Sequence, residues 1–237
     1  MYYIVESPKV LNFPITDVSH IKQLKANRDS MFICAITGND IMIWLTTTSN
    51  LIAFYQRADN SVQIHGENHT IEWKSDSSKI VVMTTKGYLI YYKITFENEF
   101  VLTDLSFSQT AWNDFSFNNS QYQNPLLTSK ITHEFSIHIQ NCQKAICCFG
   151  DEIYVPLYNG KVIKVPWTDR TRVDHFFFQL QSIYFQHEAE GEQFKIKDNI
   201  YIVEFEIINS DDGCISIAGT LSDGNAIYIS TDQSNVT

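Results

Sequence analysis

The chain has 237 residues, and its 27 acidic against 17 basic side chains give a net charge of −10. With 44% hydrophobic and 19% charged residues, the composition is that of a globular protein rather than a disordered chain. An acidic chain is not drawn to phosphate backbones, so no nucleic-acid partner is expected. The 29 Ile, 16 Phe and 12 Tyr far outnumber the 9 Ala. Such side chains suit a pleated, half-buried surface, which excludes a helix bundle or a coiled coil.

The start of the chain shows no export signal. Residues 1–9 lack a basic stretch followed by an apolar one, since Glu6 and Pro8 interrupt the segment early. No stretch approaches the ~18 consecutive apolar residues that a membrane-spanning helix needs. Five cysteines are too few and too scattered for a secreted disulfide scaffold. We therefore expect a protein of the cytoplasm.

Short apolar runs recur along the chain, separated by Gly, Asn, Asp and Ser. Each run has the length of a β-strand, and no sustained spacing of three and four residues indicates a helix between them. The predicted strands are Met31–Thr37, Ile41–Leu45, Leu51–Tyr55, Ile71–Trp73, Ile80–Thr84, Tyr88–Ile94, Phe100–Leu105, Ile131–Ile139, Ala145–Phe149, Ile153–Tyr158, Val162–Trp167, Ile200–Ile208, Cys214–Ala218 and Ala226–Ile229. Together they predict an all-β, antiparallel fold.

Four of the strand pairs form a repeat. Residues 32–44, 80–92, 153–165 and 215–229 each consist of an apolar strand, a turn of small residues and a second apolar strand. Gly, Asn or Asp in the turns can adopt the positive φ that tight hairpins require. The tryptophan and polar turn at 73–77 follow the pattern by which many WD-repeat blades enter their second strand. The sequence therefore predicts a WD-repeat-like β-propeller, in which residues 20–230 form successive four-stranded sheets.

The repeats are unevenly spaced along the chain. Taking Asp40, Gly87, Gly160 and Gly224 as equivalent points gives spacings of 47, 73 and 64 residues, whereas a typical blade repeats every ~40–45 residues. Two polar stretches, near 106–130 and 168–198, can supply the surplus as inserted loops. Aromatic residues of the first stretch either fold back on the sheet or dock a partner. The second stretch contains the run HFFFQLQSIYFQ, which can form an outer strand.

One cluster of residues suggests metal chemistry: His133, His138, Cys142, Cys147 and Cys148. Zinc needs thiolate and imidazole ligands that converge tetrahedrally, usually from paired Cys-X2–4-Cys knuckles. Cys147 and Cys148 are adjacent in a predicted strand, so their side chains should point to opposite faces, and no second knuckle follows. We therefore expect no bound zinc and five free thiols.

No motif of nucleophilic or phosphate chemistry is present. The sequence lacks a Gly-X-Ser-X-Gly elbow, a Gly-X4-Gly-Lys-Ser/Thr loop and a Gly-X-Gly-X-X-Gly fingerprint. Asp211-Asp212 is typical of a turn, and His65 and His69 lie in a predicted loop. The sequence thus predicts no catalytic residue, no cofactor and no metal site, and it leaves the partner-binding residues unknown.

The order of these pieces resembles a known family. A series of segments is similar, in the same order, to the N-terminus of the ribosome control protein family. These segments are Met1-Tyr2 with Pro8-Lys9, IMIW (41–44), LIAFY (51–55), EWKSDS (72–77), IVVMTTKGYLIYY (80–92), YNGKVI (158–163), Trp167, DGCI (212–215) and SDG (222–224). The similarity runs along most of the chain and is strongest over residues 41–94. One departure is Ser75, where blades of the family usually have proline.

The resemblance implies a function and partners. Members of that family are the large, propeller-bearing subunit of a two-subunit guanine-nucleotide exchange factor, whose second subunit has an arrestin-like fold. The complex acts on a Rab GTPase of the Rab-six type at the cytosolic face of the Golgi, in retrograde traffic from endosomes, as a peripheral membrane assembly. The resemblance therefore implies a regulatory subunit without covalent catalysis or cofactor. No short signature for GTPase contact is carried over to residues of this chain.

Two alternatives stay open. A β-propeller can serve as a generic scaffold of another assembly, such as a coat or a nuclear-pore component. A propeller enzyme with a metal in its channel needs inward-facing His or Asp clusters, which the sequence does not offer. Because family members run far beyond 237 residues, we expect residues 1–237 to be the N-terminal part of a propeller, an incomplete arc of about four blades with an uncovered last sheet.

Overall fold

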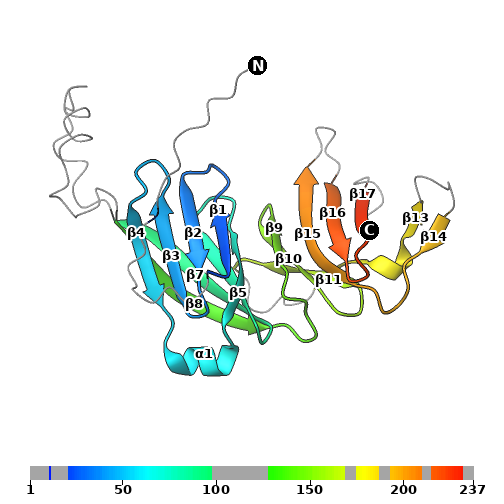
Figure 1. The fold of residues 1–237 in the computed structure, drawn as a ribbon, viewed down its shortest axis with the longest axis horizontal. Helices are drawn as coiled ribbons and strands as arrows, with labels where there is room; N and C mark the ends of the chain where they lie inside the picture. Colours follow the sequence, from blue (N-terminus) through cyan, green and yellow to red (C-terminus); the bar gives the residue numbers. More distant parts are fainter. Residues whose placement is uncertain are drawn as a thin grey trace, which may run out of the picture.

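The computed structural model describes residues 11, 21–97, 128–168, 175–186, 193–209 and 215–231. These residues form β-sheets with one short α-helix and one 3-10 turn. Figure 1 shows the sheets standing side by side in chain order, as an arc. The predicted all-β propeller class, with about four blades, is confirmed. The helix in the described part of the chain is too short and too polar to span a membrane.

Four sheets, named first to fourth, account for most strands, and every neighbouring pair within them is antiparallel. The first contains β1 (Gln23–Ala26), β2 (Phe32–Ile36), β3 (Asp40–Leu45) and β4 (Leu51–Gln56). The second contains β5 (Asn68–Trp73), β6 (Lys79–Thr84), β7 (Tyr88–Glu97) and β8 (Thr128–His138). The third contains β9 (Cys147–Phe149), β10 (Glu152–Pro156), β11 (Lys161–Pro166) and β12 (His175–Gln179). The fourth contains β15 (Ile202–Asn209), β16 (Ile215–Leu221) and β17 (Ala226–Thr231).

The first strands of the sheets lie toward a common centre. Packing between sheets joins β1 to β5, β5 to β9, and β9 to β15. Within each sheet the strands follow one another in chain order, so that β4, β8 and β12 form the outer edges. This is the arrangement of propeller blades.

The repeat seen in the sequence corresponds to the second and third strands of each sheet. Those strands pair without a register shift in all four sheets. Gly87, Gly160 and Gly224 have φ of 78°, 77° and 87°, as the turn chemistry predicts. Gly38 does not have a positive φ; its turn is instead closed by the Thr37 hydroxyl, which donates to the Asp40 carboxylate over 2.9 Å.

Hydrophobic clusters fill the space between consecutive sheets. Alternation along β6 shows why its apolar run is unbroken: Ile80 and Val82 pack against the first sheet, whereas Val81 and Met83 pack against the third. A further cluster, which contains Phe205, joins the third and fourth sheets. Inner sheets are therefore covered on both faces.

The two predicted insertions have different outcomes. Most of 106–130 lies outside the described residues, as does the predicted strand Phe100–Leu105. Only its last residues, 128–130, are described, and they begin β8. In 168–198 the predicted outer strand is confirmed as β12. The remainder, expected to be a loop, contains η1 (Leu180–Ser182) and a small hairpin of β13 (Tyr184–Gln186) and β14 (Gln193–Lys195).

Besides η1, β13 and β14, two further elements escaped the sequence prediction. β1 has the polar sequence QLKA, which carries no apolar run. The helix α1 (Asp59–His65) buries none of its residues, so it has no apolar stripe that could reveal it. The predicted loop around His65 and His69 is therefore wrong: the first ends α1 and the second lies in β5.

Candidate interaction surfaces

The cysteines and histidines that suggested a metal do not converge. Cys147 packs between the third and fourth sheets, whereas Cys148 packs between the second and third, as expected for neighbours in an extended strand. Burial raises the pKa of the Cys147 thiol to about 11, so it stays protonated at neutral pH. The four described cysteines, including Cys34 and Cys142, are free, and Cys214 lies outside the described residues, as does Asp211-Asp212. No described group of three His, Cys, Asp or Glu could hold a metal ion.

Aromatic neighbours hold the histidines in place. The ring centroids of His65 and His138 lie 4.7 and 4.6 Å from that of Tyr88. His133 lies against Tyr92, with centroids 5.8 Å apart. These residues therefore pack on strands of the second sheet and on α1 rather than forming a ligand set.

Two hollows, of about 290 and 650 Å³, lie where the first strands of the sheets come together. Both are lined by residues of β1, β5 and β15, and the larger also by β9. Lys25, Glu72 and Glu206 belong to the lining of both. Charged side chains from three sheets thus meet where the first strands come together.

An ion pair fixes the first sheet to the second at this point. Lys25 Nζ lies 2.7 Å from Glu72 Oε1, and Glu72 is only 8% exposed. Burial raises the pKa of Glu72, and the nearby ammonium offsets only part of that rise. For Lys25, burial acts to lower the pKa, but the attraction and hydrogen bond of Glu72 outweigh it, and the pKa is raised. Loss of the ion pair should therefore destabilise the charged form of Glu72 more than that of Lys25.

Hydrogen bonds from polar side chains complete this seam between the first and second sheets. The Ile71 backbone N–H donates to Gln23 Oε1 over 2.6 Å, and Trp73 Nε1 donates to the Lys25 carbonyl over 3.0 Å. Asn27 Nδ2 donates to Ser77 Oγ over 2.8 Å. Gln23 and Lys25 interrupt any apolar pattern in β1, which is why the strand was not predicted, and the same two residues bind β1 to the second sheet.

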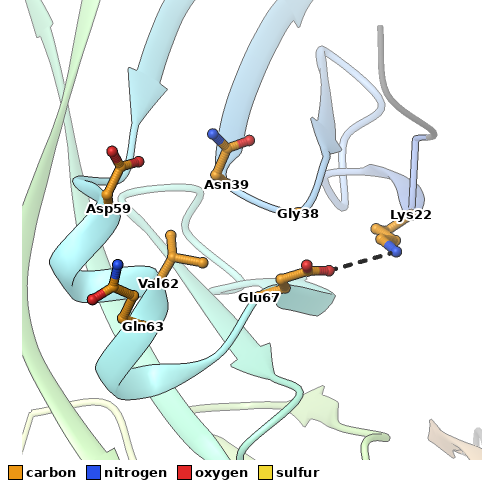
Figure 2. Close-up of a pocket in the computed structure, with 7 residues that line it drawn as sticks. All are labelled: Lys22, Gly38, Asn39, Asp59, Val62, Gln63 and Glu67. Atoms are coloured by element: carbon orange, nitrogen blue, oxygen red, sulfur yellow. Dashed lines mark ion pairs between the residues drawn. The ribbon is translucent and has the colours of Figure 1, made fainter.

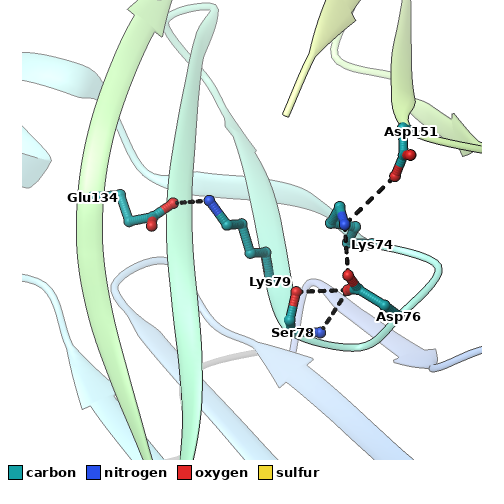
Figure 3. Close-up of polar contacts among 6 residues, drawn as sticks. All are labelled: Lys74, Asp76, Ser78, Lys79, Glu134 and Asp151. Atoms are coloured by element: carbon teal, nitrogen blue, oxygen red, sulfur yellow. Dashed lines mark hydrogen bonds and ion pairs between the residues drawn. The ribbon is translucent and has the colours of Figure 1, made fainter. Parts of the chain in front are cut away.

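The turn between β5 and β6 connects the second sheet to the third (Figure 3). Lys74 Nζ lies 2.5 Å from Asp76 Oδ2 and 3.4 Å from Asp151 Oδ1, which belongs to the turn before β10. Asp76 also accepts hydrogen bonds from the Ser78 backbone N–H and hydroxyl, over 2.9 and 2.6 Å. Partial burial acts to raise the pKa of Asp76, but these bonds outweigh it and lower the pKa to about 2. A second ion pair in the same view joins Lys79 to Glu134, 2.6 Å apart.

A third hollow, of about 530 Å³, lies between α1 and the β2–β3 turn (Figure 2). Asp59 and Gln63 of α1 line one side, and Asn39 of the turn lines another. Lys22 and Glu67 also line it and form an ion pair over 3.8 Å. Beside α1, the hollow therefore presents two carboxylates, two amides and the ammonium of Lys22.

A buried arginine fixes α1 in place. Arg57 Nη1 donates to the Gly66 carbonyl and to Asn68 Oδ1, each over 2.8 Å, and its Nη2 donates to the Ser61 carbonyl over 3.0 Å. Burial lowers the pKa of the guanidinium. Because Ser61 in the first turn of α1 and Gly66 at its C-terminal end are bonded to one side chain, α1 forms a fixed part of this surface. Ile64 of the helix is 60% exposed.

Comparison with known proteins identifies relatives. No family model matches the chain. The guanine nucleotide exchange factor subunit R06F6.8 of Caenorhabditis elegans is 26% identical over 247 aligned residues, covering 99% of this chain and 16% of that protein. The guanine nucleotide exchange factor subunits RIC1 of Homo sapiens and Mus musculus are 27% identical over 96 residues, covering 40% of this chain and 7% of each. The predicted resemblance to exchange-factor subunits is therefore confirmed, and the chain spans less than a fifth of the length of these relatives.

Two solved structures are also similar. The β-propeller domain of Myceliophteria thermophila Cps50 (Swd1) has a TM-score of 0.47 at 10% identity, over 88% of this chain and 53% of that one. The computationally designed Ika4 protein has a TM-score of 0.46 at 10% identity, over 95% of this chain and 99% of that one.

Proposed function

We propose that this chain is the propeller part of a subunit of a guanine nucleotide exchange factor that acts on a Rab GTPase. The observation that carries the proposal is the alignment of 99% of the chain with a nematode protein named as such a subunit. The resemblance of residues 41–94 to the ribosome control protein family supports a GTPase of the Rab-six type. It also supports an arrestin-like second subunit and a place at the cytosolic face of the Golgi, in retrograde traffic.

Such a subunit acts by binding and does no covalent chemistry. An exchange factor that binds the nucleotide-free GTPase more tightly than the loaded one weakens nucleotide binding by the same factor, which speeds release. Surfaces suited to this task are held rigidly, because a surface that must be ordered first loses part of its binding energy. The ion pair of Lys25 and Glu72 and the anchoring of α1 by Arg57 supply such rigidity.

A pull-down separates this function from that of a general scaffold. The purified chain, together with an arrestin-like second subunit, is incubated with immobilised Golgi Rab of the Rab-six type, either nucleotide-free or loaded with GTP. We expect retention on the nucleotide-free form in preference to the loaded form, and no retention on a Rab of another compartment. Equal retention on both forms, or none on either, would contradict the proposal and favour a propeller scaffold of another assembly.

A further inference from the structure

A fourth hollow, of about 440 Å³, lies between the second and third sheets, at the end where β6 turns into β7. It is lined by the β6–β7 turn (85–87), by residues 138–142 and Lys144 between β8 and β9, and by Tyr158 of the β10–β11 turn. The second and third sheets each pack against a sheet on both faces. A sheet added at either end of the arc would therefore not line this hollow.

The charge of this hollow differs from that of the three described above. Lys86, His138 and Lys144 line it, and no described carboxylate does. Each of the other three hollows is lined by at least two carboxylates, such as Glu72 and Glu206 in the hollow of about 650 Å³. The chain as a whole carries a net charge of −10. The hollow is therefore a local basic site on an acidic molecule.

The two lysines keep their charge uncompensated within the described part of the chain. Lys25 and Lys74, which join neighbouring sheets, have a carboxylate oxygen at 2.7 and 2.5 Å. Neither Lys86 nor Lys144 forms an ion pair with any described carboxylate. Lys86 Nζ instead donates to the Gln63 carbonyl over 2.5 Å, which positions the ammonium without neutralising it. Both lysines are exposed, so an anion can reach them.

Backbone hydrogen bonds hold the walls of the hollow in place. The Gly87 N–H donates to the Thr84 carbonyl over 3.1 Å, and the Ile139 N–H donates to the Gly87 carbonyl over 2.9 Å. The Tyr158 N–H donates to the Asn141 carbonyl over 3.0 Å, which connects the β10–β11 turn to the segment after β8. An anion that binds here does not have to order the backbone first, so less of its binding energy is lost.

We propose that this hollow binds a short acidic segment of a partner polypeptide, whose carboxylates contact Lys86 and Lys144. Charge complementarity carries the proposal, because ammonium and carboxylate groups form charge-assisted hydrogen bonds. Tyr158 is 47% exposed and offers an aromatic surface to an apolar side chain beside those carboxylates. The inference goes beyond the exchange-factor function and does not depend on it.

A short segment suits the hollow better than an extended anionic surface does. At physiological ionic strength, interactions between exposed charges are screened over about 8 Å, so a segment in the hollow is affected mainly by the lysines beside it. A membrane or a nucleic acid would cover a larger area. It would also meet Asp59 and Glu67 in the hollow beside α1, which Lys86 adjoins through Gln63. The net charge of the chain would repel such a surface.

Peptide binding to the whole 237-residue chain tests the proposal. The probe is a rhodamine-labelled peptide with three glutamates on each side of one phenylalanine, and its control has glutamine in place of every glutamate. By fluorescence anisotropy we expect saturable binding of the probe that weakens as the salt concentration rises, and no binding of the control. With benzoylphenylalanine in place of the phenylalanine, irradiation should crosslink the probe to residues 85–87, 138–144 or 158.

Substitutions that remove a positive charge locate the site. Lys86→Gln and Lys144→Gln should each weaken probe binding about fourfold, and the double variant about 15-fold. Lys144→Arg keeps the charge and should bind as the wild type does. Lys93→Gln is the matched control, because Lys93 is an exposed lysine of β7 outside the hollow and its loss changes the net charge equally. Its affinity for the probe should equal that of the wild type, and circular dichroism verifies that each variant is folded.

Three outcomes would overturn the proposal. One is an absence of saturable probe binding to the wild type. Another is an equal loss of affinity in Lys93→Gln and Lys144→Gln, since binding would then depend on total charge alone. The third is sedimentation of the wild type with phosphatidylserine vesicles that Lys144→Gln abolishes, because a lipid surface would then occupy the hollow.

Discussion

The first and fourth sheets are built from the same kind of hairpin, yet they end in different surroundings. In the first, Ile41 and Ile43 of β3 are fully buried in the cluster that the first sheet shares with the second. In the fourth, Ile208 of β15 and Tyr228 of β17 are 48% and 64% exposed on the face that points away from the third sheet. The hairpin pattern determines that both sheets form. Whether a neighbouring sheet covers a side chain determines how much that side chain contributes to the stability of the fold.

The difference extends to polar groups. The first and second sheets are joined by an ion pair and by hydrogen bonds from Gln23, Trp73 and Asn27. On the outward face of the fourth sheet, Tyr228 donates its hydroxyl proton within its own sheet, to Ser216 Oγ over 2.8 Å. Polar residues of β1 and β5 therefore join the first and second sheets in addition to the apolar side chains of the repeat.

Matched isoleucine truncations should give the largest difference between the two sheets. Ile43→Ala leaves a cavity in the cluster between the first and second sheets and should lower the free energy of unfolding by about 3 kcal/mol. Ile208→Ala removes a half-exposed side chain and should lower it by less than about 1 kcal/mol. Urea denaturation of both variants measures the two values. Equal losses would mean that the face of the fourth sheet is covered in solution.

Removal of either partner of the ion pair should have unequal effects. Lys25→Met leaves the carboxylate of Glu72 buried without a cation and should destabilise the fold by roughly 2 kcal/mol. Glu72→Gln keeps a hydrogen-bond acceptor for the partly exposed ammonium, and its cost should be about half as large. Urea midpoints at pH 7 compare the two variants. A larger loss for Glu72→Gln would show that the carboxylate does not depend on its partner.

Alanine in place of turn glycines should separate an enclosed turn from an open one. Both Gly87 and Gly224 have positive φ, so each substitution costs about 1 kcal/mol of backbone strain. At Gly87 a Cβ would also lie 2.9 Å from the Ile139 carbonyl oxygen, whereas at Gly224 nothing lies within 4 Å. Gly87→Ala should therefore lower the thermal midpoint more than Gly224→Ala does. Identical midpoints would contradict the enclosed position of the Gly87 turn.

The smallest expected effect concerns pH and the turn that contains Asp76. Its pKa in the folded chain is about 2, below the ordinary 3.8, so the stabilisation from its hydrogen bonds is complete above pH 4 and is lost as the pH falls toward 2. Because the side chain is half exposed, we expect less than about 1 kcal/mol. The unfolding free energy of Asp76→Asn should fall less than that of the wild type between pH 4 and pH 2. Parallel curves would contradict this assignment.

Much of the fold could be predicted from the sequence because its signals are local. Apolar alternation and the turn residues at Gly87, Gly160 and Gly224 determine the second and third strands of each sheet. β1 and α1 escaped prediction because neither has an apolar pattern of its own. Their position depends on contacts made after folding, such as those of Lys25 and Arg57.

The surfaces were less predictable than the strands. The pairing of Lys25 with Glu72 joins residues 47 positions apart, and Lys25 belongs to no motif. The regular pairing of β17 with β16, in contrast to the shifted pairing of β4, β8 and β12 with their neighbours, becomes evident only in the folded chain. The direction of Cys147 and Cys148 could be predicted, because it depends only on the period of an extended strand.

Hydrogen exchange of the third strands tests most directly whether the arc is open at its fourth sheet. Amides of β3, β7 and β11 have strands on both sides, whereas β17, within the part of the chain that the structure describes, has β16 on one side only. Measured on the isolated chain without peptide, the β17 amides that point away from β16 should exchange many times faster than the corresponding amides of β7. Equal protection in β17 and β7 would contradict the account and show that the fourth sheet is already complete.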